Sequence, residues 1–435
     1  MGSQDKTLEQ IFDLADQDLK CNTSYPILPE AFAEYWSNVD IMAGVDALSL
    51  YFHIPFCKNI CSFCEYTRFK AGNEKTESGY LDMLNDQTKR FIIEHPIALL
   101  YGLDVGGGTP TALSEYNFAR LMELIEKTKA DIPQVSDFES SIEFSFSTIS
   151  EAKIRAMREA GFTRASAGLQ VFDAEILKKN RRAMADFETM LYTMDLLKQY
   201  GISKRNLDLM YGLPNQTLEK CEKTVRVLEQ IMPEHITLYE TRYNMNTIKN
   251  EQLTRQSLYE QYSYFYNALT SLGYKAVFGQ NTFTLCDDEG VSSYLKYRMH
   301  SGIPYKGLGI SAQSMSCKGI SYNILKNSRE SEMPAVPQIS EQDIYLLPAE
   351  EVIAKYVCIS LYSGRIYLDF IFKMAQNDEM KKRYSAILSF LQERKYVYVQ
   401  QNACYLTETG FLHYGAIAAL FWSKHHQEYY WRTIR

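Results

Sequence analysis

Short apolar runs alternate with helical patterns through the middle of this 435-residue chain. Two of the helical patterns, at 150–161 and 186–201, end in the glycine expected just past a helix. Repeated strand–helix units predict a parallel sheet that right-handed crossovers curl into a partial TIM-type (β/α)6 barrel. A doubly wound open sheet is the alternative. The predicted strands cover 47–54, 98–107, 141–147, 164–171, 206–213 and 235–242.

Unusual residues gather where the predicted strands end, which favours the barrel over the open sheet. Three cysteines follow the first strand, a glycine triplet at 106–108 ends the second, and Glu143 lies in the third. Barrel active sites lie at the face formed by the carboxyl ends of the strands. We therefore expect one site at that face.

Composition shifts divide the chain into four expected parts. Residues 1–46 form an N-terminal extension, and residues 47–326 form the barrel. Residues 327–348 are polar, carry three prolines and lack apolar periodicity, so we expect a linker there. Residues 349–435 show helix, helix, hairpin and helix patterns, which predict a winged-helix-like α+β module.

Charge and hydrophobicity limit the function classes. Hydrophobic residues make up 46% and charged residues 23%, as in an ordinary globular protein, and the net charge is −7. An acidic chain argues against nucleic-acid binding, including by the winged-helix-like module. No secretory signal and no apolar run long enough for a membrane helix is found, so we expect a cytoplasmic protein without membrane partners.

Three of the nine cysteines, Cys57, Cys61 and Cys64, lie within eight residues. Thiolates spaced this closely can surround one soft metal centre. A [4Fe–4S] cube held by three of them would leave one iron open to a small molecule. Zinc is the rival, with His53 as the nearest fourth ligand, although its place inside a strand makes a tetrahedral site awkward.

The cysteine spacing C-x3-C-x2-C, preceded by "HIPFC", resembles the hallmark of radical S-adenosylmethionine (SAM) enzymes. The resemblance extends from Thr23 to the C-terminus through "TSYP", "GGGTPT", "GLQVFD", "NLDLMYGLP" and "GLGISAQSM". It is similar to the oxygen-independent coproporphyrinogen III oxidase (HemN)-like branch. That branch includes class C methyltransferases, anaerobic heme-opening enzymes and heme chaperones.

The resemblance implies a [4Fe–4S] cluster on Cys57, Cys61 and Cys64, with SAM on the open iron. The glycines let backbone amides approach a ligand closely, and a buried carboxylate such as Glu143 needs polar partners. No catalytic side chain is implied. The SAM contacts implied are Tyr51, Phe63, Gly106, Gly107, Gly108, Thr109, Glu143, Gln170, Arg181, Asp208 and Ile310.

Two departures from relatives guide the expected reaction. Tyr66 stands where coproporphyrinogen dehydrogenases have a fourth cysteine, and the chain lacks the heme-binding motif of the chaperones. The leading hypothesis is reductive cleavage of SAM to a 5′-deoxyadenosyl radical, followed by C-methylation or alkylation of a planar, tetrapyrrole-like substrate using a second SAM. The alternatives are coproporphyrinogen decarboxylation and a heme chaperone without turnover. The electron donor would be a low-potential carrier such as flavodoxin or ferredoxin.

Overall fold

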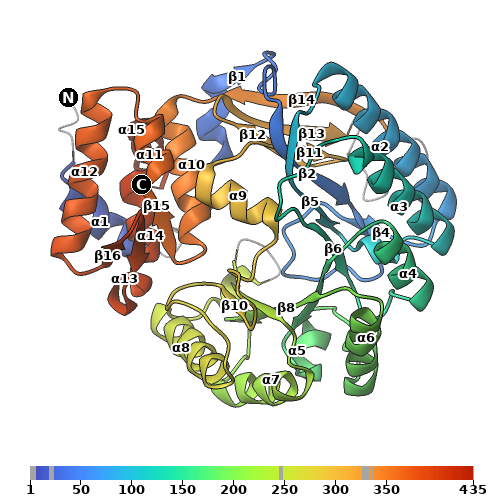
Figure 1. The fold of residues 1–435 in the computed structure, drawn as a ribbon. Helices are drawn as coiled ribbons and strands as arrows, with labels where there is room; N and C mark the ends of the chain where they lie inside the picture. Colours follow the sequence, from blue (N-terminus) through green and yellow to red (C-terminus); the bar gives the residue numbers. More distant parts are fainter. Residues whose placement is uncertain (1–5, 19–23, 244–247, 326–332, 335–336, 435) are drawn as a thin grey trace.

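The computed structural model describes residues 6–18, 24–243, 248–325, 333–334 and 337–434 (Figure 1). Thr23 of the "TSYP" motif and Cys21 lie outside these ranges. One sheet of 12 strands, in the order β1-β14-β13-β12-β11-β2-β5-β6-β7-β8-β9-β10, forms the centre of the molecule. Its ends do not pair with each other, so the barrel is open.

The six predicted strands are neighbours in this sheet and run parallel, which confirms the partial barrel. Figure 1 shows their connecting helices around the outside of the sheet. The strands are β2 (Ala47–Ile54), β5 (Leu99–Gly107), β6 (Ser140–Phe144), β7 (Arg164–Gln170), β8 (Lys204–Tyr211) and β9 (His235–Glu240). The helices are α2 (Glu74–Glu94), α3 (Glu115–Ala130), α4 (Glu151–Glu159), α5 (Ala174–Lys179), α6 (Phe187–Gln199), α7 (Leu218–Ile231) and α8 (Arg255–Ser271).

Local sequence explains these elements. In β2, Leu48, Leu50, Phe52 and Ile54 are buried in the main hydrophobic core. Because side chains alternate along a strand, the residues between them face the inside of the barrel. The barrel helices α2 to α8 each begin at an Asn, Ser, Asp or Thr whose side chain accepts a hydrogen bond from a backbone amide of the first turn.

The sheet extends beyond the six predicted strands. On the β2 side, β11 (Tyr305–Leu308) runs parallel to β2, and β12 (Gln313–Ser316), β13 (Gly319–Leu325) and β14 (Ile339–Leu346) add antiparallel strands. On the other side, β10 (Thr282–Thr284) is antiparallel to β9. Helix α9 (Ser293–Ser301) packs close to β5, where a Cβ on Gly102 would lie 2.3 Å from the Tyr294 nitrogen.

The linker prediction for 327–348 is wrong in its second half. Residues 339–346 form β14, which pairs with β13 and with the short strand β1 (Trp36–Ser37). Residues 327–332 and 335–336 lie outside the described part. The sequence "ISEQDIYL" lacks the apolar run of a buried strand because β14 lies near the edge of the sheet.

The C-terminal module has the predicted helices and hairpin, with one further strand and further short helices. It comprises α10 (Ala349–Leu361), β15 (Arg365–Tyr367), α11 (Leu368–Met374), α12 (Asp378–Glu393), β16 (Val397–Gln400), β17 (Ala403–Leu406), α13 (Glu408–Leu412), α14 (Tyr414–Phe421) and α15 (Lys424–Ile434). Its strands form a separate three-stranded sheet. Helix α1 (Leu8–Asp16) packs against this module, where Phe12 stacks on Tyr396 with ring centroids 4.9 Å apart.

Candidate functional site

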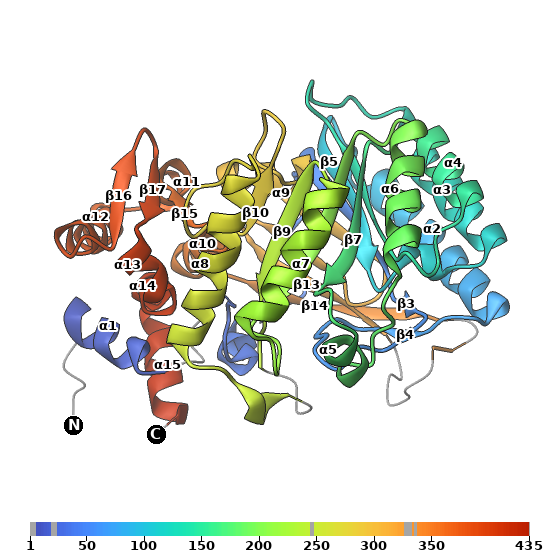
Figure 2. The same cartoon turned by 90° about the horizontal axis from the view of Figure 1, so that it is seen from below.

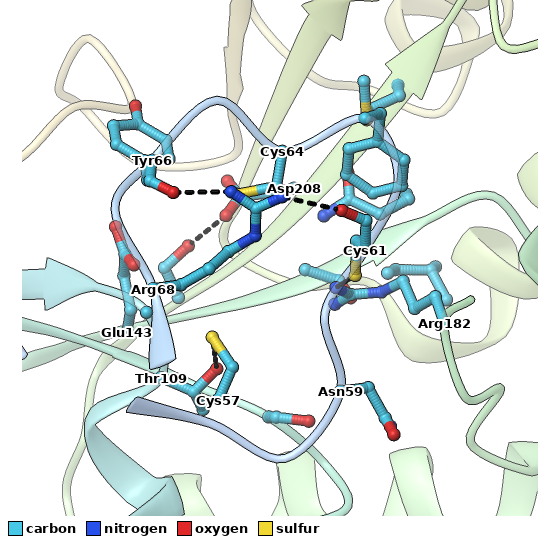
Figure 3. Close-up of a pocket in the computed structure, with 18 of the residues that line it drawn as sticks. Cys57, Asn59, Cys61, Cys64, Tyr66, Arg68, Thr109, Glu143, Arg182 and Asp208 are labelled. Carbon is cyan, nitrogen blue, oxygen red and sulfur yellow. Dashed lines mark hydrogen bonds between the residues drawn. The ribbon is translucent and has the colours of Figure 1, made fainter. Parts of the chain in front are cut away.

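A cavity of about 510 Å³ opens at the carboxyl ends of the parallel strands (Figure 3). This volume falls within the range of about 300–1,000 Å³ typical of ligand sites. Nine of the predicted site residues line it: Cys57, Cys61, Phe63, Cys64, Gly108, Thr109, Glu143, Gln170 and Asp208. The fold therefore brings together side chains that are up to 151 positions apart in the sequence, from Cys57 to Asp208.

The three cysteines lie on one loop that follows β2. Cys57 ends the short strand β3 (Phe56–Cys57), and the other two precede β4 (Phe69–Lys70), which pairs with β3. Arg68 fastens the loop, because its guanidinium donates to the Tyr66 carbonyl at 2.6 Å and to the Cys61 carbonyl at 3.2 Å. Figure 3 shows the Arg68 side chain among the three cysteines.

The cysteine thiols suit an iron–sulfur cube better than a single ion. All three are free thiols that line the same cavity. Their sulfur atoms do not all lie within 4.8 Å of one another; among the described residues only His235, Cys286 and Asp288 meet that condition. One tetrahedral zinc ion draws its ligands closer together, whereas each thiolate of a cube binds its own iron.

Burial and nearby polar groups shift the pKa values of the thiols in opposite directions. Burial raises the pKa of the Cys57 thiol to about 11, whereas its contact with Thr109 and the charge of Arg68 act to lower it. Burial also raises the pKa of Cys64. Metal binding to these thiols would therefore release protons. Arg182 adds a second cation, with its Nη1 3.6 Å from the Cys61 sulfur.

Glu143 is one of four acidic residues that line the cavity, with Glu65, Asp208 and Glu240. Its carboxylate accepts a hydrogen bond from the Gly107 amide at 3.2 Å, and a Cβ on Gly106 would lie 2.6 Å from it. Burial, followed by the nearby charge of Asp208, raises the pKa of Glu143 to about 8. The glycines at 106 and 107 thus leave space for this carboxylate.

Asp208 is the other predicted acidic residue of the cavity. It accepts hydrogen bonds from Ser166 at 3.0 Å and from Asn206 at 2.8 Å. Burial raises its pKa, and the Ser166 hydrogen bond acts against that shift. Gln170 ends β7 nearby with a left-handed backbone, φ 65°. Two carboxyl groups with separate partners can receive two sets of cationic or hydroxyl groups from ligands.

Five predicted SAM contacts do not line this cavity. Gly106 and Gly107 lie behind Glu143. Tyr51 is half-buried, and its hydroxyl lies 3.2 Å from His53 Nδ1. Ile310 lines a neighbouring cavity that shares Tyr66 and Arg68 with the first. Arg181 is exposed.

The prediction of Arg181 as a cavity residue is wrong, because the turn after α5 directs its neighbour inward. Arg181 has a left-handed backbone with φ 56° and lies on the surface. Arg182 lines the cavity and donates to the Gly168 carbonyl. Both arginines stand in "KKNRRA", and the sequence pattern does not distinguish them.

Sequence reasoning also missed the residues at the far side of the cavity. Tyr239 and Tyr362 face each other with ring centroids 6.0 Å apart, and Arg242 lies 5.6 Å from the centre of the Tyr362 ring. Tyr66 lines the same cavity. The high tyrosine content was the one available signal, since Tyr362 comes from the C-terminal module.

Comparison with known proteins identifies the family. Residues 51–228, which include the cysteine loop and the strands β5 to β8, match the Radical SAM superfamily. This match assigns residues 51–228 to the radical SAM superfamily. The relatives of the chain support the HemN-like branch of that superfamily.

Two curated relatives and one solved structure illustrate the similarity. The chain is 24% identical to the heme chaperone HemW of Bacillus subtilis over 83% of this chain and 96% of that protein. It is 32% identical to the oxygen-independent coproporphyrinogen III oxidase of Paracoccus denitrificans, over 54% of this chain but only 52% of that enzyme. Coproporphyrinogen III oxidase (HemN) of Escherichia coli has the same fold, with a TM-score of 0.72, 22% identity and coverage of 93% and 97%.

Membership of the radical SAM superfamily implies a [4Fe–4S] cluster and SAM. Cys57, Cys61 and Cys64 would hold the cluster, and the polar groups around Glu143 would hold SAM beside it. The bound pair supplies one-electron chemistry that generates a carbon radical for hydrogen abstraction. The protein's residues orient the ligands and exclude water, for which the enclosed aromatic walls are suited. In the part of the chain that the structure describes, no helix could span a membrane.

The raised pKa of Glu143 predicts a pH-dependent stability. Below a pH of about 8 the buried carboxyl is protonated in the folded chain, whereas in the unfolded chain it ionises near 4.5. The folded state therefore loses stability relative to a Glu143→Gln variant as the pH rises from about 5 to about 8, and the difference is constant above that. Thermal unfolding of both proteins without SAM should show that the melting temperature of the variant rises relative to that of the wild type from pH 5 to pH 8. A difference in melting temperature that is the same at pH 5 and pH 8 would contradict the prediction.

Proposed function

We propose that this radical SAM enzyme alkylates an unsaturated carbon of a planar, tetrapyrrole-like substrate and takes the alkyl group from a second SAM. The observation that carries the proposal is that Glu143 and Asp208, two of the four acidic residues that line one cavity, have separate hydrogen-bond partners. SAM presents a cationic sulfonium and amine as well as ribose hydroxyls, and each of these favours a carboxylate partner. One acidic group would serve the SAM beside the cysteines and the other would serve the second SAM.

The replacement of a fourth cysteine by Tyr66 supports alkylation over decarboxylation. Tyr66 lies beside Cys64 and is close enough to Glu143 for that carboxylate to raise its pKa, after burial as the largest cause. A neutral phenol contributes a flat apolar face and a hydrogen-bond donor, but no thiol.

Tyr66, Tyr239, Tyr362 and Arg242 supply a substrate compartment. Burial is the largest cause that raises the pKa of each of the three phenols, so they stay neutral. Their rings provide faces for stacking on a conjugated ring system. Arg242, which is 3.8 Å from Glu65, is placed to bind a carboxylate on the same substrate. These features favour a flat, anionic substrate.

Product analysis with the reconstituted protein tests the reaction. Under anaerobic reduction with SAM and coproporphyrinogen III, we expect 5′-deoxyadenosine, S-adenosylhomocysteine and an alkylated tetrapyrrole. The names of the relatives define the two competing outcomes. Protoporphyrinogen without S-adenosylhomocysteine would show an oxidase, as in the Paracoccus relative. Tight heme binding without 5′-deoxyadenosine would show a chaperone, as in the Bacillus relative.

Arg242→Gln should weaken binding of a carboxylated ring. A charge-assisted hydrogen bond contributes about 1.5–3 kcal/mol, so the affinity for coproporphyrin III should fall by about 10- to 100-fold. Porphyrin fluorescence titration measures this. The tetramethyl ester of the same porphyrin should bind both proteins equally. Arg226→Gln, on the exposed face of α7, is the matched control. Unchanged coproporphyrin affinity in Arg242→Gln would remove this residue from the substrate compartment.

A further inference from the structure

The segment 178–182, "KKNRR", is strongly basic in a chain whose acidic residues outnumber its basic ones by 53 to 46. It begins in the last turn of α5 and contains four cations and no acid. Figure 2 shows α5 at the same end of the molecule as β3 and β4, which flank the cysteine loop. The charge of these five residues is therefore opposite in sign to that of the whole chain.

This segment directly supports the cysteine loop. The Ser62 amide donates to the Asn180 carbonyl at 3.2 Å, and the Ser62 hydroxyl donates to the Asn180 side-chain oxygen at 2.8 Å. Asn180 is buried, and Arg182 reaches the Cys61 sulfur. Three contacts thus connect the basic segment to the residues between Cys57 and Cys64.

The other basic side chains of the segment face solvent. Lys178, Lys179 and Arg181 are exposed. Lys179 pairs with Glu251, whereas Lys178 and Arg181 form no ion pair with any residue in the described ranges. Two apolar side chains, Ile60 on the cysteine loop and Met184, are also exposed, by 37% and 36%. Exposed cations beside apolar side chains are typical of a surface for a transient, acidic partner.

We propose that Lys178, Arg181 and the neighbouring Ile60 and Met184 form the docking surface for an acidic one-electron carrier protein of the flavodoxin or ferredoxin kind. One electron leaves the reduced flavin or iron–sulfur centre of the carrier, which is oxidised by one electron. It would reduce by one electron the cluster that Cys57, Cys61 and Cys64 would hold; no atom is transferred. Because the whole chain carries −7, its net charge repels an acidic carrier. A local basic surface would select the productive orientation.

The docking surface is independent of the alkylation proposed above, because every reaction of a radical SAM protein begins with one-electron reduction. A failure of the docking test therefore leaves the product analysis unaffected, and the reverse also holds.

The double variant Lys178→Glu/Arg181→Glu tests the surface. With the cluster-loaded protein, its affinity for oxidised flavodoxin or ferredoxin, measured by calorimetry at low salt, should fall by about 10-fold or more. The rate at which the reduced carrier reduces the protein, followed by electron paramagnetic resonance, should fall by a similar factor. Reduction and SAM cleavage driven by dithionite should be unchanged. Added salt should slow the wild type more than the variant.

Lys381→Glu/Lys382→Glu, on the exposed face of α12, is the matched control, because it changes the net charge equally and far from the cysteine loop. This control should keep its carrier affinity. The proposal is overturned if the two double variants lose affinity equally, or if the first keeps wild-type affinity. It is also overturned if dithionite-driven SAM cleavage falls with the carrier-driven rate, because the segment would then serve the SAM site.

Discussion

Replacing Cys61 with serine should abolish reductive cleavage of SAM, and the same holds for Cys57 and Cys64. A serine hydroxyl is a harder and far less acidic ligand than a thiol, and iron–sulfur clusters depend on thiolate ligands. Among the described residues, only three cysteines line the cavity, so none of the other described thiols lines the site to replace a lost one. Iron and sulfide content after anaerobic reconstitution should fall to a small fraction of the wild-type value, and 5′-deoxyadenosine should fall to background.

Cys317→Ser is the matched control, because Cys317 is an exposed free thiol that does not line the cavity. It should retain full iron content and SAM cleavage. A Cys61→Ser protein that keeps its visible iron–sulfur absorption and still produces 5′-deoxyadenosine would remove this loop as the cluster site. Zinc in place of iron in the wild type would contradict the family chemistry altogether.

Gly107→Ala should have the second largest effect, a loss of both folding stability and SAM binding. Gly107 has φ 108°, which residues with a side chain rarely adopt, and a Cβ there would lie 2.4 Å from the His53 ring. The His53 ring cannot move freely, because the residue is only 3% exposed and its ring nitrogens are hydrogen-bonded to the Tyr51 hydroxyl and the Thr67 carbonyl. We expect destabilisation of about 2–4 kcal/mol from strain and overpacking. SAM binding should be lost, because the Gly107 amide would no longer hold Glu143.

Gly72→Ala separates backbone strain from the steric clash. Gly72 has φ 112°, but a Cβ there would meet nothing within 4 Å. This variant should show only the strain cost, about 1–3 kcal/mol, with normal SAM affinity measured by equilibrium binding. If both glycine variants bind SAM equally well, the close packing behind Glu143 has no functional role.

The strands and the ends at which polar residues gather could be predicted because both depend on short-range patterns. Apolar periodicity predicts the start of β2 at Ala47. Gly161 and Gly201, which have positive φ, mark where two of the predicted helices end. Strand β14 could not be predicted, because a strand near the edge of the sheet needs no apolar run and is defined by its partners β13 and β1. Similarly, "KKNRRA" gives no periodicity that separates Arg181 from Arg182.

The sequence alone determined the donor chemistry, since three thiols within eight residues must lie close together wherever that loop is placed. It also determined the parallel strand–helix architecture through local apolar periodicity. Only the tertiary structure decided which side chains share the cavity with those thiols. The left-handed turn at Arg181 directs Arg182 toward Cys61, and the packing of the C-terminal module brings Tyr362 beside Tyr239. Such contacts join distant segments, so no local pattern in the chain records them.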